Sequence, residues 1–274
     1  MGKSTLLNFL VQSKIAAVSP KPQTTRGMVR GLIQSEQGQA VLLDTPGFQK
    51  QKDQMGQWMS QQIQEAIDSA DLIWWMMKPN GAQPFDAHIL DWVKRAHKPT
   101  FLLINQIDTV KKEKIIPVID RLKDYCAFNE IVPISAQTGV NLDRLLACLF
   151  QYLPEHPPYF DQEILSPENE RDIAAELIRE QLYHFTHQEL PYATTIRLES
   201  FQEGKPVEIE ATVLVERESQ KGIVIGQNGK TIHQMRRHAE KALQLFLQRP
   251  VRLELRVKVM RDWKEKLTPT RKKR

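Results

Sequence analysis

Short apolar runs alternate with helix-length amphipathic segments along residues 1–153, and this alternation restricts the possible folds more than any other feature. The runs occupy residues 40–43, 72–77, 100–104 and 131–134. Strands that are buried on both faces read as continuous apolar runs, and helices between them are typical of a sheet wrapped on both sides. We therefore predict an α/β domain over residues 1–153, doubly wound, with a mostly parallel sheet.

A phosphate-binding motif stands at the start of the chain. It reads Gly2-Lys3-Ser4-Thr5 and leads into a helical run at residues 6–10. This is the second half of the P-loop GxxxxGK[ST], in which the lysine reaches the β and γ phosphates and the next hydroxyl ligates Mg²⁺. Free amides at the start of the helix face the anion. Four such residues often occur by chance, so the motif gains weight only from those that accompany it.

A second motif, Asp44-Thr45-Pro46-Gly47, follows the run at residues 40–43. Alone, this sequence is an ordinary turn. At the carboxyl end of a buried strand, however, it lies where open α/β sheets bind their ligands. The Asp44 carboxylate is then available to the Mg²⁺ shell, and the Gly47 amide can sense a γ-phosphate.

Two further motifs follow the next strands and point to guanine. Asn105 and Asp108 follow one strand, and Ser135 and Ala136 follow another. A fixed carboxylate that accepts from two guanine N–H groups rejects adenine, which lacks these donors. Backbone amides at the last pair can reach the base carbonyl. Asn-x-x-Asp alone is more typical of a cap, but four motifs in this order favour a GTP site and disfavour an ATPase.

The pattern changes after residues 154–167, which carry four prolines and no apolar periodicity and therefore predict a linker. Residues 168–262 read as helix, two strands, short helix, a GxxG loop, helix and strand. This order predicts an α+β domain of the KH type. In such domains the GxxG loop clamps the backbone of about four unpaired nucleotides.

The candidate RNA-binding residues lie at and around this loop. The loop reads Gly226-Gln227-Asn228-Gly229, and Lys221 and Lys230 flank it. Alone, the loop sequence is also that of an ordinary turn. Arg252, Arg256 and Lys258 share the polar face of the final strand and extend the candidate phosphate-contacting surface.

Charge is distributed unevenly along the chain. Residues 221–274 hold 16 Lys and Arg against 4 Asp and Glu, whereas residues 1–220 hold 22 against 29. A basic C-terminal fifth attracts a polyanion such as RNA. Residues 263–274 are expected to form a basic tail, a solvated run of the usual kind, but the tail accounts for only part of the excess.

The four N-terminal motifs, the Gln23-Thr24-Thr25-Arg26 segment and the C-terminal GQNG loop together resemble the Era family of bacterial GTPases over nearly the whole chain. The resemblance implies a P-loop GTPase domain followed by a type II KH domain, with GTP or GDP and Mg²⁺ as cofactors. It also implies binding to the 3′ end of small-subunit ribosomal RNA and a role in 30S subunit assembly. The protein is then expected to be a cytoplasmic monomer, with peripheral association at the inner membrane.

Site residues follow from the resemblance position by position. It implies that Lys3 contacts phosphate, that Ser4 and Thr25 hold Mg²⁺ and that Asp44 lies in the outer shell. Thr24 stays open as an alternative to Thr25. The base pocket takes Asn105, Asp108, Ser135 and Ala136, as above. We assign no catalytic side chain, because Phe48 stands where many GTPases have a water-orienting Gln.

Two departures from the family pattern affect the nucleotide site. Gln106 replaces a lysine whose stem covers the base, so we expect weaker guanine affinity. The chain also starts inside the phosphate-binding loop, so the first strand, expected at the centre of the sheet, is missing. We favour a longer natural protein. The alternative is an RNA-binding KH protein whose GTPase domain is degenerate and inactive.

Other residues point to no further chemistry. Cys126 and Cys148 lie apart from each other and from histidine, which favours a reducing compartment over a disulfide or a zinc site. His184 and His187 are interpreted as a surface pair. No apolar run approaches the roughly 20 residues that a spanning helix needs.

Overall fold

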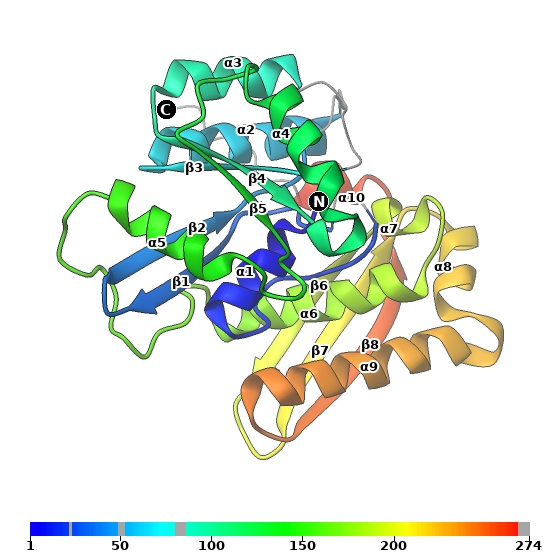
Figure 1. Ribbon diagram of the computed structural model, residues 1–274. Helices are drawn as coiled ribbons and strands as arrows, with labels where there is room; N and C mark the ends of the chain where they lie inside the picture. The colour runs from blue at the N-terminus through cyan, green and yellow to red at the C-terminus, as the bar shows by residue number, and fades with distance from the viewer. Residues whose placement is uncertain (22–23, 49–52, 80–85, 268–274) are drawn as a thin grey trace, which may run out of the picture.

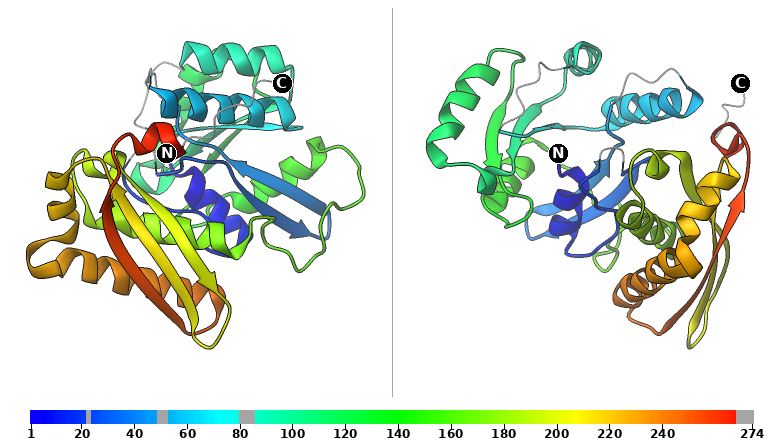
Figure 2. Two further views of the ribbon diagram at one scale, coloured as in Figure 1. Left: turned by 180° about the vertical axis from the view of Figure 1, so that it is seen from behind. Right: turned by 90° about the vertical axis from the view of Figure 1, so that its right-hand side faces the viewer.

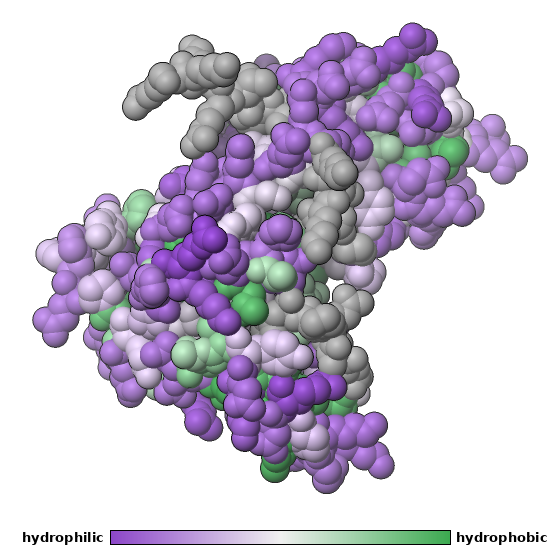
Figure 3. All heavy atoms as spheres, turned by 90° about the horizontal axis from the view of Figure 1, so that it is seen from above, coloured by the Kyte–Doolittle hydropathy of each residue, from purple (hydrophilic) through white to green (hydrophobic). Residues whose placement is uncertain are grey.

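The computed structural model describes residues 1–21, 24–48, 53–79 and 86–267, and it contains two α/β units that pack against each other (Figure 1). Gln23 lies outside the described residues. The face shown in Figure 3 is largely hydrophilic, with small apolar areas between the polar ones. Within the described ranges, no helix combines the length and the hydropathy that a membrane span requires.

The first unit alternates strands and helices as predicted. Its elements are α1 (Lys3–Val11), β1 (Val29–Ser35), β2 (Gly38–Asp44), α2 (Gln54–Ser69), β3 (Ile73–Met77), α3 (Ala87–Ala96), β4 (Thr100–Asn105), two 3₁₀ turns η1 (Ile107–Thr109) and η2 (Lys112–Lys114), α4 (Ile115–Leu122), β5 (Glu130–Ile134) and α5 (Leu142–Tyr152). All four predicted apolar runs lie in or overlap strands. Strand β1 was not predicted.

The strands form two sheets in place of the one continuous sheet that we expected. Strands β3, β4 and β5 form a parallel sheet, and β1 pairs with β2 in a separate antiparallel ribbon. Among the described residues no strand lies between β2 and β3. Side chains bridge this position, because Ala40 of β2 belongs to the same apolar cluster as Trp74 of β3. The α/β class is confirmed, and the sheet is divided where the central strand was expected to be absent.

The second unit has the KH order of elements. It contains α6 (Glu170–Phe185), α7 (Leu190–Ala193), β6 (Thr194–Gln202), β7 (Val207–Val215), α8 (Glu218–Ile225), η3 (Gln227–Gly229), α9 (Lys230–Leu247), β8 (Val251–Val259) and α10 (Trp263–Leu267). The sheet order is β6-β7-β8, with β7 and β8 parallel. Helices α6 and α9 cover one face of this sheet, and none of the described elements covers the other face (Figure 2, right).

The predicted tail at residues 263–274 needs a correction. Residues 263–267 form helix α10, and Trp263 is 1% exposed. Its indole Nε1 donates to the backbone oxygen of Ala193 at 3.0 Å. The large buried ring of Trp263 anchors this segment. The sequence did not indicate this anchor, because the residues around Trp263 are mostly charged. Residues 268–274 lie outside the described residues.

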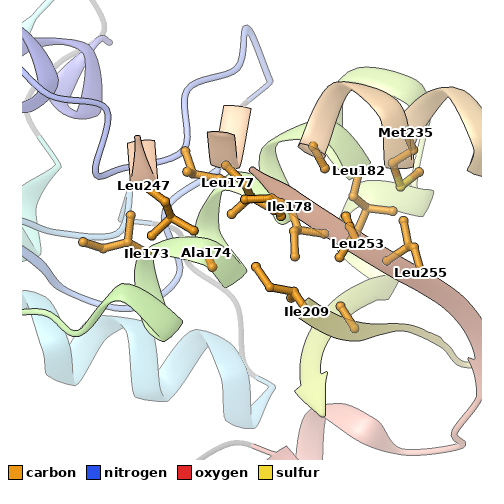
Figure 4. Packing of buried hydrophobic residues seen from close by; sticks show 14 of the residues in the cluster. Ile173, Ala174, Leu177, Ile178, Leu182, Ile209, Met235, Leu247, Leu253 and Leu255 are labelled. Atoms are coloured by element: carbon orange, nitrogen blue, oxygen red, sulfur yellow. The ribbon is translucent and has the colours of Figure 1, made fainter. Parts of the chain in front are cut away.

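One hydrophobic cluster extends across both units. Helix α6 packs Ile173, Leu177 and Ile178 against the KH sheet and α9 (Figure 4), and the same cluster continues to Leu7 and Val11 of α1. Each such side chain, when fully buried, contributes roughly 1.5–3 kcal/mol. Helix α6 is also buried on its second side, where the charged residues Arg179 and Glu180 are each 4% exposed. The orientation of the KH unit is therefore fixed through α6 and α1.

The segment at residues 154–167 has no helix or strand and runs beside β1. The backbone N–H of Leu32 donates to the carbonyl of Leu165 at 2.8 Å. The Arg30 guanidinium forms an ion pair with Glu168 at 2.8 Å. The segment that we predicted as a linker is thus hydrogen-bonded to the first unit.

Candidate nucleotide site and GxxG loop

Three oxygen-bearing side chains from different elements meet at one point. Ser4 lies in the first turn of α1, Asp44 ends β2, and Thr25 lies in the connection between α1 and β1. The Ser4 hydroxyl donates to Asp44 Oδ2 at 2.5 Å and lies 2.8 Å from the Thr25 hydroxyl. Thr25 in turn donates to the same carboxylate oxygen at 3.2 Å. The structure therefore brings together the three residues expected to surround Mg²⁺.

The electrostatics of this point fit a divalent cation. Asp44 is 4% exposed, and its second carboxylate oxygen, Oδ1, is buried with no hydrogen-bond partner among the described residues. Burial raises the pKa of Asp44, and the nearby Lys3 ammonium opposes that shift. Hydroxyl and carboxylate oxygens are the ligands that Mg²⁺ prefers. A cation at this point would stabilise the ionised form of the buried carboxylate.

The structure also distinguishes the two threonines left open by the sequence. The Thr24 hydroxyl donates to the carbonyl of Lys21 at 2.9 Å and lies 2.8 Å from the Ser19 hydroxyl. Thr24 makes no hydrogen bond with Asp44, whereas Thr25 does. The geometry favours Thr25.

The start of α1 has the backbone geometry that we expect of an anion site. Gly2 caps the helix in the left-handed region at φ 95°, and a Cβ on it would lie 2.4 Å from Asn105 Nδ2. No side chain caps the helix, so the first-turn amides, with Lys3 and Thr5 beside them, are available to a phosphate.

Asn105 has a structural role beside the base-reading role that we predicted. It is 1% exposed; its Nδ2 donates to the carbonyl of Met1 at 2.8 Å, and its Oδ1 accepts from the amide of Ala136 at 2.9 Å. This side chain ties the phosphate loop to the Ser135–Ala136 turn. The Ala136 amide is paired with Asn105 here, and contact of this turn with the base carbonyl stays a prediction.

The remaining base-pocket residues are placed differently. Asp108 lies in η1 and is exposed, so its carboxylate is available to a base. Gln106 precedes it in the left-handed conformation, at φ 70°. Ser135 is fully buried, and its hydroxyl accepts from the amide of Thr138 at 3.2 Å, so it shapes the turn.

Gly47 and Phe48 follow β2. A Cβ on Gly47 would meet no heavy atom within 4 Å, so the fold leaves open space beside it. The Phe48 ring points to α3, where its centroid lies 5.8 Å from that of Trp92 and 6.2 Å from that of His88. It offers no hydrogen bond to an attacking water.

The segment that carries Thr25 also contacts the KH unit, which the sequence did not predict. Arg26 Nη2 donates to the carbonyl of Pro191 at 2.8 Å and to the Tyr183 hydroxyl at 3.3 Å. Its guanidinium lies over the rings of Tyr183 and Trp263. The Lys21 ammonium bonds the carbonyls of Tyr183 and Thr186. Burial lowers the pKa of Arg26, and the contact with Tyr183 opposes that shift.

The two glycines of the GxxG loop have different roles. Gly226 has φ 74°, and a Cβ on it would lie 2.2 Å from Thr231 Oγ1. Gly229 has φ 75°, and a Cβ on it would meet nothing within 4 Å. The fold itself requires Gly226, whereas the space at Gly229 is open to a ligand. Gln227 and Asn228 between them are exposed.

The flanking lysines differ as well. Lys230 begins α9 and is exposed. Lys221 lies in α8, where its ammonium is 3.9 Å from the Glu218 carboxylate. Ile223 of the same helix is 59% exposed, so an apolar side chain stands free beside the loop.

The basic residues of β8 do not lie with the loop. Strand alternation places Leu253 and Leu255 in the core under the helices, so Arg252, Arg256 and Lys258 point to the uncovered face. On that face Arg252 lies 3.7 Å from Glu208, and Arg256 lies 2.6 Å from Glu254. We therefore correct the expectation that these residues extend the surface around the GxxG loop.

Comparisons with known proteins match both units. Residues 1–106 match a family described as 50S ribosome-binding GTPase, and residues 189–264 match the KH domain family. A structure of an Aquifex aeolicus Era variant bound to GDP and AlF4⁻ superposes with a TM-score of 0.93 at 35% identity, covering 97% of this chain and 92% of that one. A structure of Era with MgGDPNP and nucleotides 1506–1542 of 16S ribosomal RNA matches with the same TM-score, the same identity and the same coverage of both chains.

Proposed function

The chain belongs to the Era family of GTPases, and from this premise we propose that it is a GTP-controlled switch that binds small-subunit ribosomal RNA through its KH domain during 30S subunit assembly. The observation that carries the proposal is the meeting of Ser4, Thr25 and Asp44, beside a segment that contacts the KH domain. The catalytic activity is hydrolysis of GTP to GDP and phosphate.

Each residue around the nucleotide has its own role in this proposal. Lys3 and the first-turn amides of α1 neutralise the phosphates. Ser4 and Thr25 would hold Mg²⁺, with Asp44 in its outer shell, and the bound cation would neutralise charge that develops on the phosphate oxygens. The open space at Gly47 lets its backbone approach a γ-phosphate. Because Phe48 packs on α3, no side chain at that position orients water, and slow intrinsic hydrolysis follows.

Coupling between the two domains runs through consecutive residues. The Thr25 hydroxyl lies at the cation position, and the Arg26 side chain lies between α6, α7 and α10 of the KH unit. A change of partner at Thr25 on nucleotide binding displaces the backbone of Arg26. The KH unit therefore responds to the nucleotide state through this contact.

The KH domain provides the RNA site. The exposed pair Gln227 and Asn228, the open space at Gly229 and the free side chain of Ile223 support a clamp for unpaired nucleotides. Similarity to the complex with nucleotides 1506–1542 of 16S ribosomal RNA favours the 3′ region of that RNA as the ligand. We propose further that the protein acts as a monomer and that any membrane association is peripheral.

Titration of a fluorescent GDP analogue against this chain, with and without Mg²⁺, tests the nucleotide half of the proposal. We expect saturable binding that EDTA weakens. Absence of saturable binding, together with intact binding of single-stranded RNA, would favour the second candidate, a KH protein with an inactive GTPase domain. The observation that favours this second candidate is the division of the sheet beside α1 into two parts.

A further inference from the structure

The outward face of α9 is basic and carries no carboxylate. The exposed helix residues that share it, at helical spacing, are Lys230, His233, Gln234, Arg237, His238, Lys241, Gln244 and Leu245, and Gln248 caps the helix on the same side. We call these residues the α9 face. The one acidic residue of the helix, Glu240, is turned aside, where it pairs with Arg236 at 2.7 Å and accepts from the amide of Leu253 at 3.0 Å.

The cations on this face differ from those on the uncovered face of the sheet. There, Arg252 and Arg256 each have a carboxylate partner, and Glu208, Glu210, Glu254 and Glu199 balance the charge of the strands. Within the described ranges, neither Arg237 nor Lys241 of the α9 face forms an ion pair. A solvated surface of mixed sign needs no partner, whereas one of a single sign attracts a polyanion.

The α9 face is continuous with the GxxG loop. Lys230 directly follows Gly229, and the helix extends from there with its outer side uncovered by other elements, since α9 packs on α6, α8 and β8 (Figures 1 and 2). From Lys230 to Lys241 the helix rises about 16 Å at 1.5 Å per residue. A KH groove holds about four nucleotides, so a longer RNA must leave the loop across a neighbouring surface.

We propose that the α9 face binds the phosphate backbone of RNA that continues beyond the nucleotides held by the GxxG loop. Arg237 and Lys241 contact phosphates, while the glutamine and histidine side chains donate to phosphate or ribose oxygens. The inference rests on the proposed RNA-binding function and extends it. RNA fits better than a lipid surface, because an interfacial helix inserts a broad apolar face and this one exposes only Leu245.

The test compares two double variants of the full chain that remove the same charge. R237Q with K241Q alters the α9 face, and R252Q with R256Q alters the uncovered face of the sheet. Binding is measured with Mg²⁺ and GDPNP over a range of salt concentrations. The probes are RNA of nucleotides 1506–1542 of 16S ribosomal RNA, as in the similar complex, and a single-stranded fragment of about ten nucleotides from its 3′ end.

For the long RNA we expect the first variant to bind about tenfold or more weakly, with the slope of log K against log salt reduced by about two. Its affinity for the short fragment should stay within about twofold of the unaltered chain, which also shows that the loop is intact. The second variant should match the unaltered chain on both probes.

Equal losses in the two variants, or no loss in either, would overturn the inference while leaving the proposed function standing. If the unaltered chain binds neither RNA, the proposed function fails together with the inference. Anionic vesicles of phosphatidylglycerol and phosphatidylcholine form a third arm. Vesicle binding that R237Q with K241Q abolishes, without loss on the long RNA, would also contradict the inference.

Discussion

The guanidinium of Arg26 lies 5.3 Å from the centre of the Trp263 ring, so the residue that follows Thr25 contacts the first residue of the C-terminal helix. The two positions are far apart in the sequence, and their contact crosses the boundary between the GTPase and KH domains. Helix α10 also packs on α2, which follows the Asp44–Gly47 motif. Both nucleotide-sensing segments therefore adjoin the same end of the KH domain.

Replacing Arg26 with lysine should weaken the contact between the domains. Lysine keeps the charge but cannot bond Pro191 and Tyr183 with one planar group while stacking on Trp263. We expect a loss of about 1–3 kcal/mol in the free energy of unfolding, measured by urea titration. Arg30→Lys is the control, because its pair with Glu168 is exposed and worth less than about 1 kcal/mol. Equal losses in both variants would show that the buried contact has no special role.

Asp44 should make the nucleotide-free protein less stable as pH rises. Burial raises its pKa above the ordinary value of 3.8, so the folded state binds this proton more tightly than the unfolded state does. The resulting stability is complete below the unfolded pKa and is lost as pH rises through the folded one. Asparagine carries no charge at any pH, so Asp44→Asn should abolish this pH dependence. At neutral pH the variant buries no charge, and its free energy of unfolding should therefore be higher than that of the unaltered chain.

The same variant should lose the response to Mg²⁺, because an amide cannot replace the carboxylate beside the cation. Urea unfolding of both proteins between pH 4 and pH 8, with and without Mg²⁺ and GDP, provides the measurement. A variant whose pH profile and Mg²⁺ response match those of the unaltered chain would refute this account of Asp44.

The sequence predicted the strands that are buried on both faces, and it missed β1. Strands such as β4, whose residues are all buried, read as unbroken apolar runs. In β1 the pattern is interrupted by Arg30 and Gly31. The structure explains the glycine, because a Cβ on it would lie 2.6–3.0 Å from side chains of Leu7, Val11 and Ile15. Such close packing depends on the position of α1, which periodicity does not reveal.

The candidate site was predictable to a similar degree. Motif order indicated that Ser4 and Asp44 belong to one site, because strand ends and helix starts meet at one edge of a sheet. The resemblance to the Era family added Thr25, with Thr24 as the alternative. Motif order did not indicate what Asn105 bonds, because both of its partners are backbone groups that only the folded loops bring together. The contact of Arg26 with α6 and α7 was also invisible, since it joins residues more than 150 positions apart.

Asn105 and Asp108 should therefore respond differently to removal. Asn105→Ala leaves the buried Ala136 amide unpaired and releases the partly buried Met1 carbonyl, so we expect the free energy of unfolding to fall by about 1–3 kcal/mol. Asp108→Ala alters an exposed side chain and should leave stability within about 0.5 kcal/mol. It should instead reduce the preference for GDP over ADP. Unfolding and competition titrations separate the two effects, and a stable Asn105→Ala variant would contradict the bridging role.

The GxxG loop is best tested at its two middle positions. Substituting Gly226 would force a clash with Thr231, and loss of binding would then report misfolding. Gln227→Asp with Asn228→Asp adds two charges at exposed positions, and aspartate tolerates the left-handed conformation of residue 228.

We expect single-stranded RNA to bind at least tenfold more weakly to this double variant, because the new carboxylates repel the phosphates that the loop clamps. Gln37→Asp with Gln202→Asp adds the same charge at exposed positions outside the loop and should cost less than about threefold. Thermal unfolding of all three proteins confirms folding. If both double variants lose affinity equally, net charge and not the loop governs binding, and the KH groove is not the RNA site.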